Sequence, residues 1–321
     1  MEYLLIIIIS ILFAMNMGGS GIAPSFSSLY GGGFIDKKRA VVLFGILVIL
    51  GAMLLGRNVS TTIGKKIIPG GIHEPSLALS VIASATICLL IANILKIPQS
   101  TSMETVSAVV GAGLYLKKLD TKILLLKIIP SWIILPLLSF FLTAYLYRKI
   151  YPPNHNNIHI YERLFLNEKK LKIISYLSAL YVSFAIGTNN VANVVGPLYG
   201  AGLIGMNKGL LFLSPLFGFG AFIFGSGTLE TAGKKVARLG LISSSLVSFV
   251  TGSILLIASV FGIPFPLVEL NLCSIMAINK VKNSETSFFN AWEIRKIFYI
   301  WSLTPILAGL ISFALCHLTH R

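Results

Sequence analysis

Residues 187–197 read Gly-Thr-Asn-Asn-Val-Ala-Asn-Val-Val-Gly-Pro. This polar stretch is the feature of the sequence that best indicates the fold. They interrupt a long apolar segment that begins near residue 171, and they carry asparagines and a threonine where a helix facing lipid would carry leucine. An unpartnered amide or a broken backbone is costly in hydrocarbon, so it is tolerated only inside protein or along a cavity. A helix interrupted at mid-membrane depth also exposes N–H groups that suit an anion. We therefore interpret residues 187–197 as half of a substrate site.

The composition indicates a polytopic membrane protein. Hydrophobic residues make up 55% of the 321 residues and charged residues only 12%, which leaves too little polar surface for a soluble domain of this length. The net charge of +15 is typical of cytoplasmic loops and contacts with lipid headgroups. We expect a multi-pass protein of the cell membrane whose partner is the bilayer and not a nucleic acid, because no compact basic domain is present.

Apolar runs predict the membrane segments. They lie near residues 3–17, 40–55, 76–97, 105–116 and 123–147, and again near 171–186, 190–204, 208–225, 240–263, 264–279 and 297–318. Several are shorter than the ~20 residues that span a bilayer, so broken or re-entrant helices are expected beside full spans. The sequence predicts an all-α polytopic fold with roughly 10–12 membrane segments, and its first apolar run, which follows no basic region, is predicted to be a retained helix.

A polar linker at residues 151–172 divides the chain into an N-terminal repeat, 1–150, and a C-terminal repeat, 173–321. Adding 169 to the numbers of residues 18–66 aligns them without a gap with residues 187–235.

Identical residues recur through this alignment. Tyr30 meets Tyr199, Gly51 meets Gly220, and Gly-Lys-Lys at residues 64–66 meets the same tripeptide in the second half. Two related halves are typical of a transporter whose site lies between them. The short segments leave open, at this point, whether the repeats are inverted or parallel.

The alignment also places Gly18-Gly19-Ser20-Gly21 opposite the start of the central stretch. Glycines permit close backbone approach, so this segment can present N–H groups and hydroxyls to an anion. The alternative is a helix-packing face of small residues. For each serine taken singly, a packing role and contact with the anion are equally well supported. The two matching interruptions taken together favour a substrate site.

Proline begins a second pair of polar interruptions, at residues 97–105 and 263–271. Proline ends one helix and can begin another, which frees backbone donors. Ser100, Thr101 and Ser102 add three hydroxyls in a row; one of them is expected to cap the following helix, and the other two can bind an oxyanion.

Two acids, Glu104 and Glu269, lie within uncharged segments. An ionisable group at membrane depth suggests ion or proton handling; the alternative is a glutamate in the first helical turn, stabilised by the helix dipole. All five histidines are predicted in loops or the tail, and the cysteines lack metal spacing. We therefore expect neither a metal site nor a cofactor.

These motifs carry a resemblance. Residues 187–197 resemble the Gly-Ala-Asn-Asp-Val-Ala-Asn-Ala-Phe-Gly-Pro signature of the inorganic phosphate transporter family, and residues 98–102 resemble its Pro-Val-Ser-Thr-Thr-His motif. The resemblance covers nearly the whole chain. It implies an inverted-repeat helical fold, often dimeric, with paired re-entrant hairpins, that carries an oxyanion together with cations. The family's substrate contacts would fall on Asn189, Asn193, residues 100–102 and Ser20.

The departures from the signature concern charge. Asn190 and Gly21 stand where the family has an aspartate that binds a cation, and residues 14–21 are similar to the family's sulfate-permease branch. Sulfate has no hydrogen to donate at neutral pH, so it favours a site rich in donors and poor in carboxylates, and the loss of two acids disfavours sodium coupling.

The sequence therefore predicts a secondary transporter, not an enzyme, that imports sulfate with protons rather than sodium by alternating access. The alternatives are a sodium- or proton-coupled phosphate transporter and, in another class, an anion channel. The predicted ion-coupling residues are Glu104 and Glu269. The predicted substrate site consists of Gly18, Gly19, Ser20, Gly21, Ser100, Thr101, Ser102, Asn189, Asn190 and Asn193.

Overall fold

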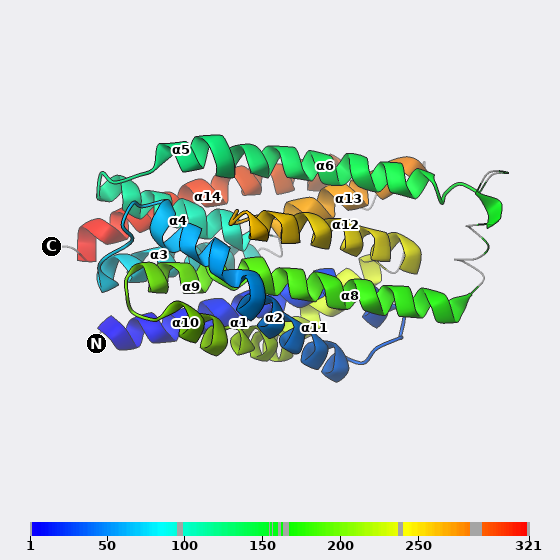
Figure 1. Cartoon of the computed structure of the whole chain (residues 1–321), viewed down its shortest axis with the longest axis horizontal. Coiled ribbons are helices and arrows are strands. Elements are labelled where there is room, and N and C mark those ends of the chain that lie inside the picture. Colours follow the sequence, from blue (N-terminus) through cyan, green and yellow to red (C-terminus); the bar gives the residue numbers. More distant parts are fainter. Residues whose placement is uncertain are drawn as a thin grey trace.

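The computed structural model of the chain is an elongated bundle of helices (Figure 1). It describes residues 2–94, 99–153, 155, 157–159, 162, 167–236, 240–282 and 291–319, and no strand occurs in this part of the chain. The first half contains α1 (Glu2–Gly31), α2 (Lys37–Thr61), the π-helical turn η1 (Thr62–Lys66), α3 (Pro75–Ile94), α4 (Thr101–Tyr115), α5 (Thr121–Ile123), the π-helical turn η2 (Leu124–Ile128) and α6 (Ile129–Arg148). The second contains α8 (Glu168–Asn190), α9 (Ala192–Gly200), α10 (Met206–Leu213), α11 (Pro215–Val236), α12 (Leu241–Val260), α13 (Leu267–Lys282) and α14 (Ala291–Thr319).

Eight helical stretches of the described chain are long and apolar enough to cross a membrane. Large apolar side chains on their outer faces, such as Leu54 and Leu126, are exposed, as expected where lipid replaces water. The 15-residue α4 and the 16-residue α13 are too short to cross as straight helices, and each packs against the helix before it, α3 or α12. The all-α polytopic fold is confirmed, while the eight candidate spans of the described chain are fewer than the roughly 10–12 membrane segments that the sequence predicts.

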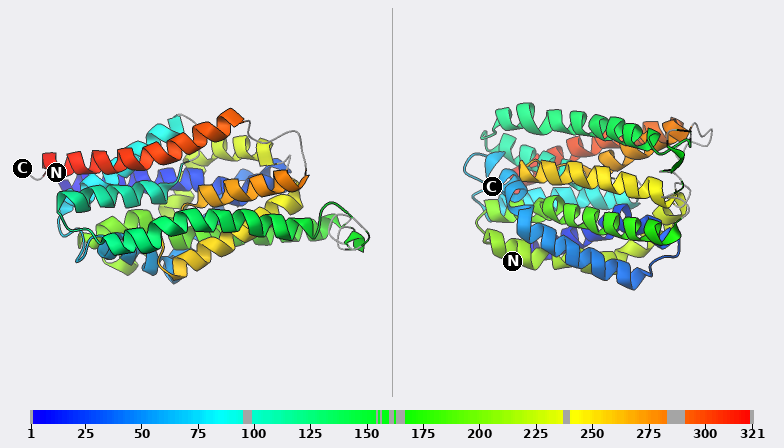
Figure 2. Two further views of the ribbon diagram at one scale, coloured as in Figure 1. Left: turned by 90° about the horizontal axis from the view of Figure 1, so that it is seen from above. Right: turned by 45° about the vertical axis from the view of Figure 1, so that its right-hand side comes forward.

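Helices of the two halves pack against one another. α1 lies along α11 and α2 lies along α8, while α4 packs on α14 and α13 packs on α6 (Figures 1 and 2). A Cβ added to Gly18 would lie 2.1 Å from the carbonyl oxygen of Phe217, and one added to Gly187 would lie 2.2 Å from that of Val48. These glycines therefore let two pairs of helix backbones approach within contact distance.

The interruption predicted in the second half is confirmed, whereas the matching one in the first half is wrong. α8 ends at Asn190, a single turn residue follows, and α9 begins at Ala192. α1 instead continues through Gly18, Gly19, Ser20 and Gly21 and past Pro24 to Gly31. Because nothing else in hydrocarbon satisfies backbone N–H and C=O groups, scattered glycines and one proline do not end a membrane helix that is packed along its length.

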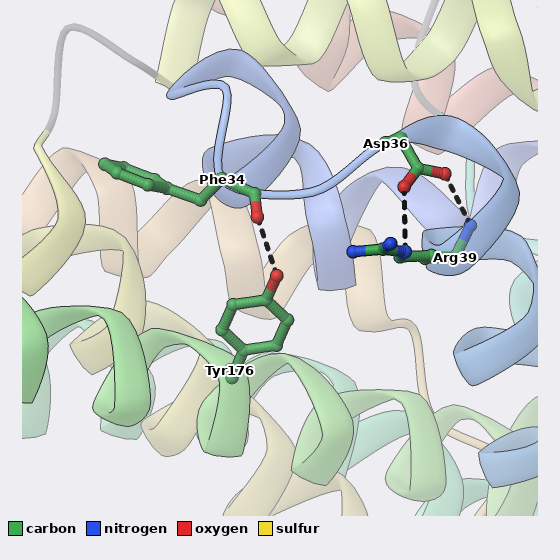
Figure 3. A network of polar contacts seen from close by, with 4 residues as sticks. All are labelled: Phe34, Asp36, Arg39 and Tyr176. Atoms are coloured by element: carbon green, nitrogen blue, oxygen red, sulfur yellow. Dashed lines mark hydrogen bonds and ion pairs between the residues drawn. The ribbon is translucent and has the colours of Figure 1, made fainter.

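The predicted linker, residues 151–172, lies between α6 and α8 and includes the first residues of α8. α6 ends at Arg148 and α8 begins at Glu168, and part of residues 151–172 lies outside the described residues. The N-terminal part of α8 also holds the corner between α1 and α2 (Figure 3).

At this corner the Tyr176 hydroxyl donates a 2.7 Å hydrogen bond to the Phe34 carbonyl oxygen. Asp36 caps α2 by accepting a 2.9 Å hydrogen bond from the amide of Arg39, whose side chain also pairs with it. A carboxylate at a helix start satisfies a free amide and the helix dipole. The hydrogen bond of Tyr176 thus ties the N-terminal part of α8 to the corner between α1 and α2.

Candidate substrate site

Three helix starts meet where α8 gives way to α9. α9 begins at Ala192 after the break, α4 begins at Thr101 behind its N-cap Ser100, and α13 begins at Leu267. The first amides of a helix have no acceptor within the helix, and the helix dipole makes its start positive. A junction of three such starts is suited to an anion.

Asn193 joins the α9 start to the α4 start. Its Nδ2 donates 3.1 Å hydrogen bonds to Thr101 Oγ1 and to Ser102 Oγ, and its side chain is fully buried. Both hydroxyls act as acceptors here, so each keeps its own proton to donate. The Oδ1 atom of Asn193 has no hydrogen-bond partner in the described structure. These three residues form the cluster of predicted site residues that the fold brings together.

Ser100 has the capping role expected for one of the three hydroxyls. Its Oγ accepts a 3.3 Å hydrogen bond from the amide of Met103. The neighbouring Gln99 donates from Nε2 to Thr304 Oγ1 of α14. Both side chains therefore hold α4 in place. Ser100 does so as an acceptor, which leaves its hydroxyl proton to donate at the site.

The side chain of Asn189 forms hydrogen bonds with other parts of the protein and is not free to bind an anion. Its Nδ2 donates to Ser259 Oγ (2.9 Å) and to the Ile263 carbonyl oxygen (3.0 Å), and its Oδ1 accepts from the amide of Phe265 (2.9 Å). Thr188 adds a 2.8 Å hydrogen bond to the same Ser259 hydroxyl. In this conformation Asn189 therefore fastens the connection between α12 and α13 to the end of α8.

Three further donors, which the sequence interpretation missed, bind carbonyl oxygens of the same connection. Asn58 Nδ2 donates to Val260 (2.9 Å), Lys127 Nζ donates to Phe261 (2.7 Å), and Trp132 Nε1 donates to Pro264 (2.9 Å). A signal existed for two of them, because Asn58 and Lys127 are polar residues within apolar segments. Side chains of α2, η2, α6 and α8 together define the position of the α13 start.

Glu104 and Glu269 lie in the first turns of α4 and α13, the position given by the alternative interpretation of these two acids. Their side chains are 0% and 3% exposed, and none of their four carboxyl oxygens has a hydrogen-bond partner in the described structure. The two groups lie close enough to repel each other when ionised, with Gln99 near Glu104. Among the described residues neither forms an ion pair. Two ionised carboxylates buried together lose hydration and repel each other. A proton on one of them removes the repulsion and its own desolvation cost, and a second proton removes the remaining cost.

The first-half residues Gly18, Gly19, Ser20 and Gly21 are placed differently. A Cβ on Gly19 would lie 2.6 Å from Phe224 Cβ of α11, and Ser20 Oγ donates to the carbonyl oxygens of Asn16 (3.3 Å) and Met17 (3.2 Å) of its own helix. No hydrogen bond in the described structure joins these four residues to Asn193, Thr101 or Ser102. They form the small-residue packing face that was the alternative interpretation.

Asn190 lies at the last turn of α8, and its Oδ1 is buried without a hydrogen-bond partner in the described structure. Together with Asn193 it supplies two free amide oxygens on either side of the helix break. The junction thus holds donors, from helix starts and hydroxyls, as well as oxygen acceptors.

A multi-pass helical bundle with a buried polar junction of helix starts defines a membrane transporter. The chain belongs to the phosphate transporter family, whose sequence model matches residues 17–312. It is 36% identical over 313 residues to the sulfate permease CysP of Bacillus subtilis (strain 168), an alignment that covers 97% of this chain and 86% of that protein.

Two further similarities extend this result. The chain is 31% identical over 170 residues to the sodium-dependent phosphate transporter 1-B of Danio rerio, covering 50% of this chain and 24% of that protein. Its fold matches a solved structure entitled "The sodium-dependent phosphate transporter" with a TM-score of 0.84 at 21% identity, over 99% of this chain and 98% of that one. The chain is thus a multi-pass membrane transporter of an inorganic anion and not an enzyme.

Proposed function

We propose that the chain imports sulfate together with protons, and that the anion binds at the junction of the α4, α9 and α13 starts. The observation that carries the proposal is the pair of buried, unpartnered carboxyls of Glu104 and Glu269 beside this set of donors. A dianion cannot share a buried site with ionised carboxylates, because like charges in low dielectric repel strongly.

Proton coupling follows from this electrostatic conflict. If Glu104 and Glu269 carry protons when the anion enters, the repulsion disappears and anion and protons arrive together. When the protons leave toward the side of lower proton concentration, the restored carboxylates expel the anion. The carboxyls then couple the two fluxes without any direct contact to a metal ion.

Sulfate is favoured over hydrogen phosphate by the donors of the junction. Thr101 and Ser102 offer hydroxyl protons and the first two amides of α4, while at the junction the neutral Asn190 stands where the family signature has an aspartate. Sulfate is fully deprotonated at neutral pH and accepts hydrogen bonds without donating any. The similarity to a sulfate permease along nearly the whole chain supports the same choice.

Sodium-coupled phosphate transport is the second candidate, and one observation favours it. The unpartnered Oδ1 atoms of Asn190 and Asn193 and the carboxyls of Glu104 and Glu269 are oxygen ligands of the kind that hard cations prefer. When ionised, the two glutamates supply negative charge near the junction, in place of the signature aspartates that this chain lacks. The argument against sodium from Asn190 and Gly21 alone is therefore incomplete.

Alternating access is proposed to arise from two inverted repeats. In Figure 1, α1 runs away from the end marked N, whereas its partner in the alignment, α8, starts at the opposite end. The packing of α1 on α11 is repeated by α8 on α2, and that of α4 on α14 by α13 on α6. The contact of Gly187 with Val48 repeats that of Gly18 with Phe217 at the 169-residue offset.

The same offset extends to α6 and α14. Trp132 and Pro136 of α6 have Trp301 and Pro305 of α14 as counterparts, and both prolines lie inside their helices. A pseudo-two-fold axis in the membrane plane accounts for all these pairs. Rocking of one repeat against the other would expose the junction to each side in turn.

Uptake into proteoliposomes tests the function. Radiolabelled sulfate and phosphate are each offered with an inward proton gradient, an inward sodium gradient or neither, and empty liposomes serve as the control. Sulfate accumulation above the outside concentration with the proton gradient alone is the expected result. Phosphate accumulation that needs sodium would support the second candidate, and equilibration of anion without accumulation under every gradient would indicate a channel.

A further inference from the structure

A groove lies between the C-terminal parts of α6 and α13, far from the polar junction along both helices. Its cavity volume is about 360 Å³, its walls include Phe140, Phe141 and Tyr145 of α6, and Arg148 and Lys280 lie at its edge. Figures 1 and 2 show that the two helices end at the same end of the bundle.

The groove is preformed, because polar contacts beneath it hold the two helices together. Ser139 Oγ and Ser274 Oγ lie 2.6 Å apart, and Thr143 Oγ1 donates to Ser274 Oγ at 3.0 Å. All three side chains are buried. The groove therefore does not depend on a ligand for its shape.

The groove lies at the edge of the membrane. The candidate span that contains α6 ends at Arg148, so the aromatic walls face the outermost acyl chains and the basic edge faces the headgroups. Phe141 is 65% exposed and Tyr145 is 58% exposed. Aromatic residues in contact with basic ones are typical of this boundary.

The positive charges at the edge have no protein counter-ion in the described structure. Neither Arg148 nor Lys280 forms an ion pair with a described carboxylate. Lys280 Nζ lies 5.9 Å from the centre of the Phe140 ring, and Lys149 Nζ lies 4.5 Å from that of Tyr145. Such contacts orient the ammonium groups along the groove wall and leave their charge available.

We propose that this groove binds one anionic phospholipid. The headgroup phosphate lies between Arg148 and Lys280, and an acyl chain lies along Phe140, Phe141 and Tyr145. Clusters of basic residues beside a membrane span attract anionic lipids, and Lys149 follows Arg148 directly in the chain. The site differs from the polar junction, where buried carboxyls take the place of unpaired cations.

Other occupants fit less well. A free sulfate or phosphate ion would gain nothing from three aromatic walls. A second copy of the chain docking through a two-fold axis would bring Arg148 and Lys280 against their own counterparts, and like charges oppose this. A phospholipid matches both the charge at the edge and the apolar surface beside it.

Native mass spectrometry of the full chain tests the proposal. The detergent-purified protein is titrated with phosphatidylglycerol or with phosphatidylcholine of the same acyl chains. The wild type is compared with the double variant R148Q/K280Q and with the matched control K117Q/K118Q at the other end of the bundle. We expect one tightly bound phosphatidylglycerol, and a loss of about fivefold in its affinity for each groove charge removed, with the control variant unchanged.

Four results would overturn the proposal. They are equal binding of the two lipids, equal loss of affinity in both double variants, displacement of the lipid by 10 mM sodium sulfate, and a dimer that R148Q/K280Q dissociates, which would indicate a second copy in the groove. Phe141→Ser tests the apolar wall separately. It should weaken the binding of both lipids, while the ratio of the affinity for phosphatidylglycerol to that for phosphatidylcholine stays the same. Exposed positions were chosen for all substitutions, so size-exclusion profiles should stay those of the wild type.

Discussion

The side-chain oxygen of Asn189 accepts a 2.9 Å hydrogen bond from the backbone amide of Phe265, 76 residues later in the chain. The bond ties the end of α8 to the residues that precede α13. It makes Asn189 a support of the connection between α12 and α13, and loss of the Asn189 side chain leaves the buried amide of Phe265 without an acceptor.

Asn189→Ala should therefore lower stability more than it lowers affinity for the anion. A buried donor without an acceptor costs about 1–3 kcal/mol, and the thermal unfolding midpoint in detergent should fall accordingly. Ser20→Ala at the aligned position is the control, since Ser20 Oγ bonds only to its own helix. Equal unfolding midpoints for Asn189→Ala and Ser20→Ala would contradict the supporting role.

Asn193→Ala should lower affinity for the anion more than it lowers stability. It removes the donor that orients Thr101 and Ser102 and the free Oδ1 at the junction. We expect sulfate affinity, measured by isothermal titration in detergent, to fall by about tenfold or more, as for the loss of a charge-assisted contact. Sulfate affinity that stays within a factor of two of the wild type would place the anion elsewhere.

Glu104→Gln and Glu269→Gln separate coupling from binding. Glutamine mimics the protonated carboxyl and cannot release a proton, so exchange of sulfate across proteoliposomes should persist while accumulation driven by a proton gradient is lost. A pH-sensitive dye inside the liposomes should report sulfate-dependent acidification for the wild type and for the control variant, but not for the glutamine variants of Glu104 and Glu269. Glu168→Gln, which removes an exposed partner of Lys172, is the matched control. Full accumulation by the double glutamine variant would show that protons couple elsewhere.

The pH dependence of binding has a definite sign. The protonated carboxyls of Glu104 and Glu269 admit a dianion and the ionised carboxylates repel it, so sulfate affinity should be highest at low pH and should decline as pH rises. The double glutamine variant should bind sulfate with an affinity that pH changes little. Measuring sulfate dissociation constants in sodium-free buffer across the neutral range checks both, and a wild-type affinity that rises with pH would contradict proton coupling.

Gly187→Ala should destabilise the fold, whereas Gly227→Ala should not. An added Cβ at Gly187 meets the Val48 backbone at 2.2 Å, while the one at Gly227 meets nothing within 4 Å. Overpacking of this kind costs about 1–3 kcal/mol or more, and alanine in an exposed helix gains up to about 1 kcal/mol over glycine. The measurement is the fraction of monodisperse protein that remains after heating. A Gly187→Ala variant as heat-resistant as the wild type would show that α2 and α8 can move apart.

Sequence reasoning reached the fold class, an interruption within residues 187–197, a helix cap among residues 100–102 and the family, because each leaves a local signal. Proline, asparagine and runs of hydroxyls are rare in apolar segments, so they stand out without knowledge of their neighbours. It was wrong about a break at Gly18 to Gly21, since the same small residues serve close packing when another helix lies beside them. That choice depends on α11, which lies about 200 positions later in the chain.

The sequence by itself determined that this chain is a polytopic helical membrane protein with polar interruptions at the α8–α9 break and at the starts of α4 and α13, because hydrocarbon admits little except continuous helices and makes every exception conspicuous. Only the tertiary structure decided what each polar group does. In the folded chain Asn189 supports the connection between α12 and α13, whereas Asn193 lies at the junction of helix starts. The fold also brings Glu104 and Glu269 together from opposite halves of the chain. The physical reason is that a buried polar group takes its role from the partner that satisfies it, and here those partners come from distant parts of the chain.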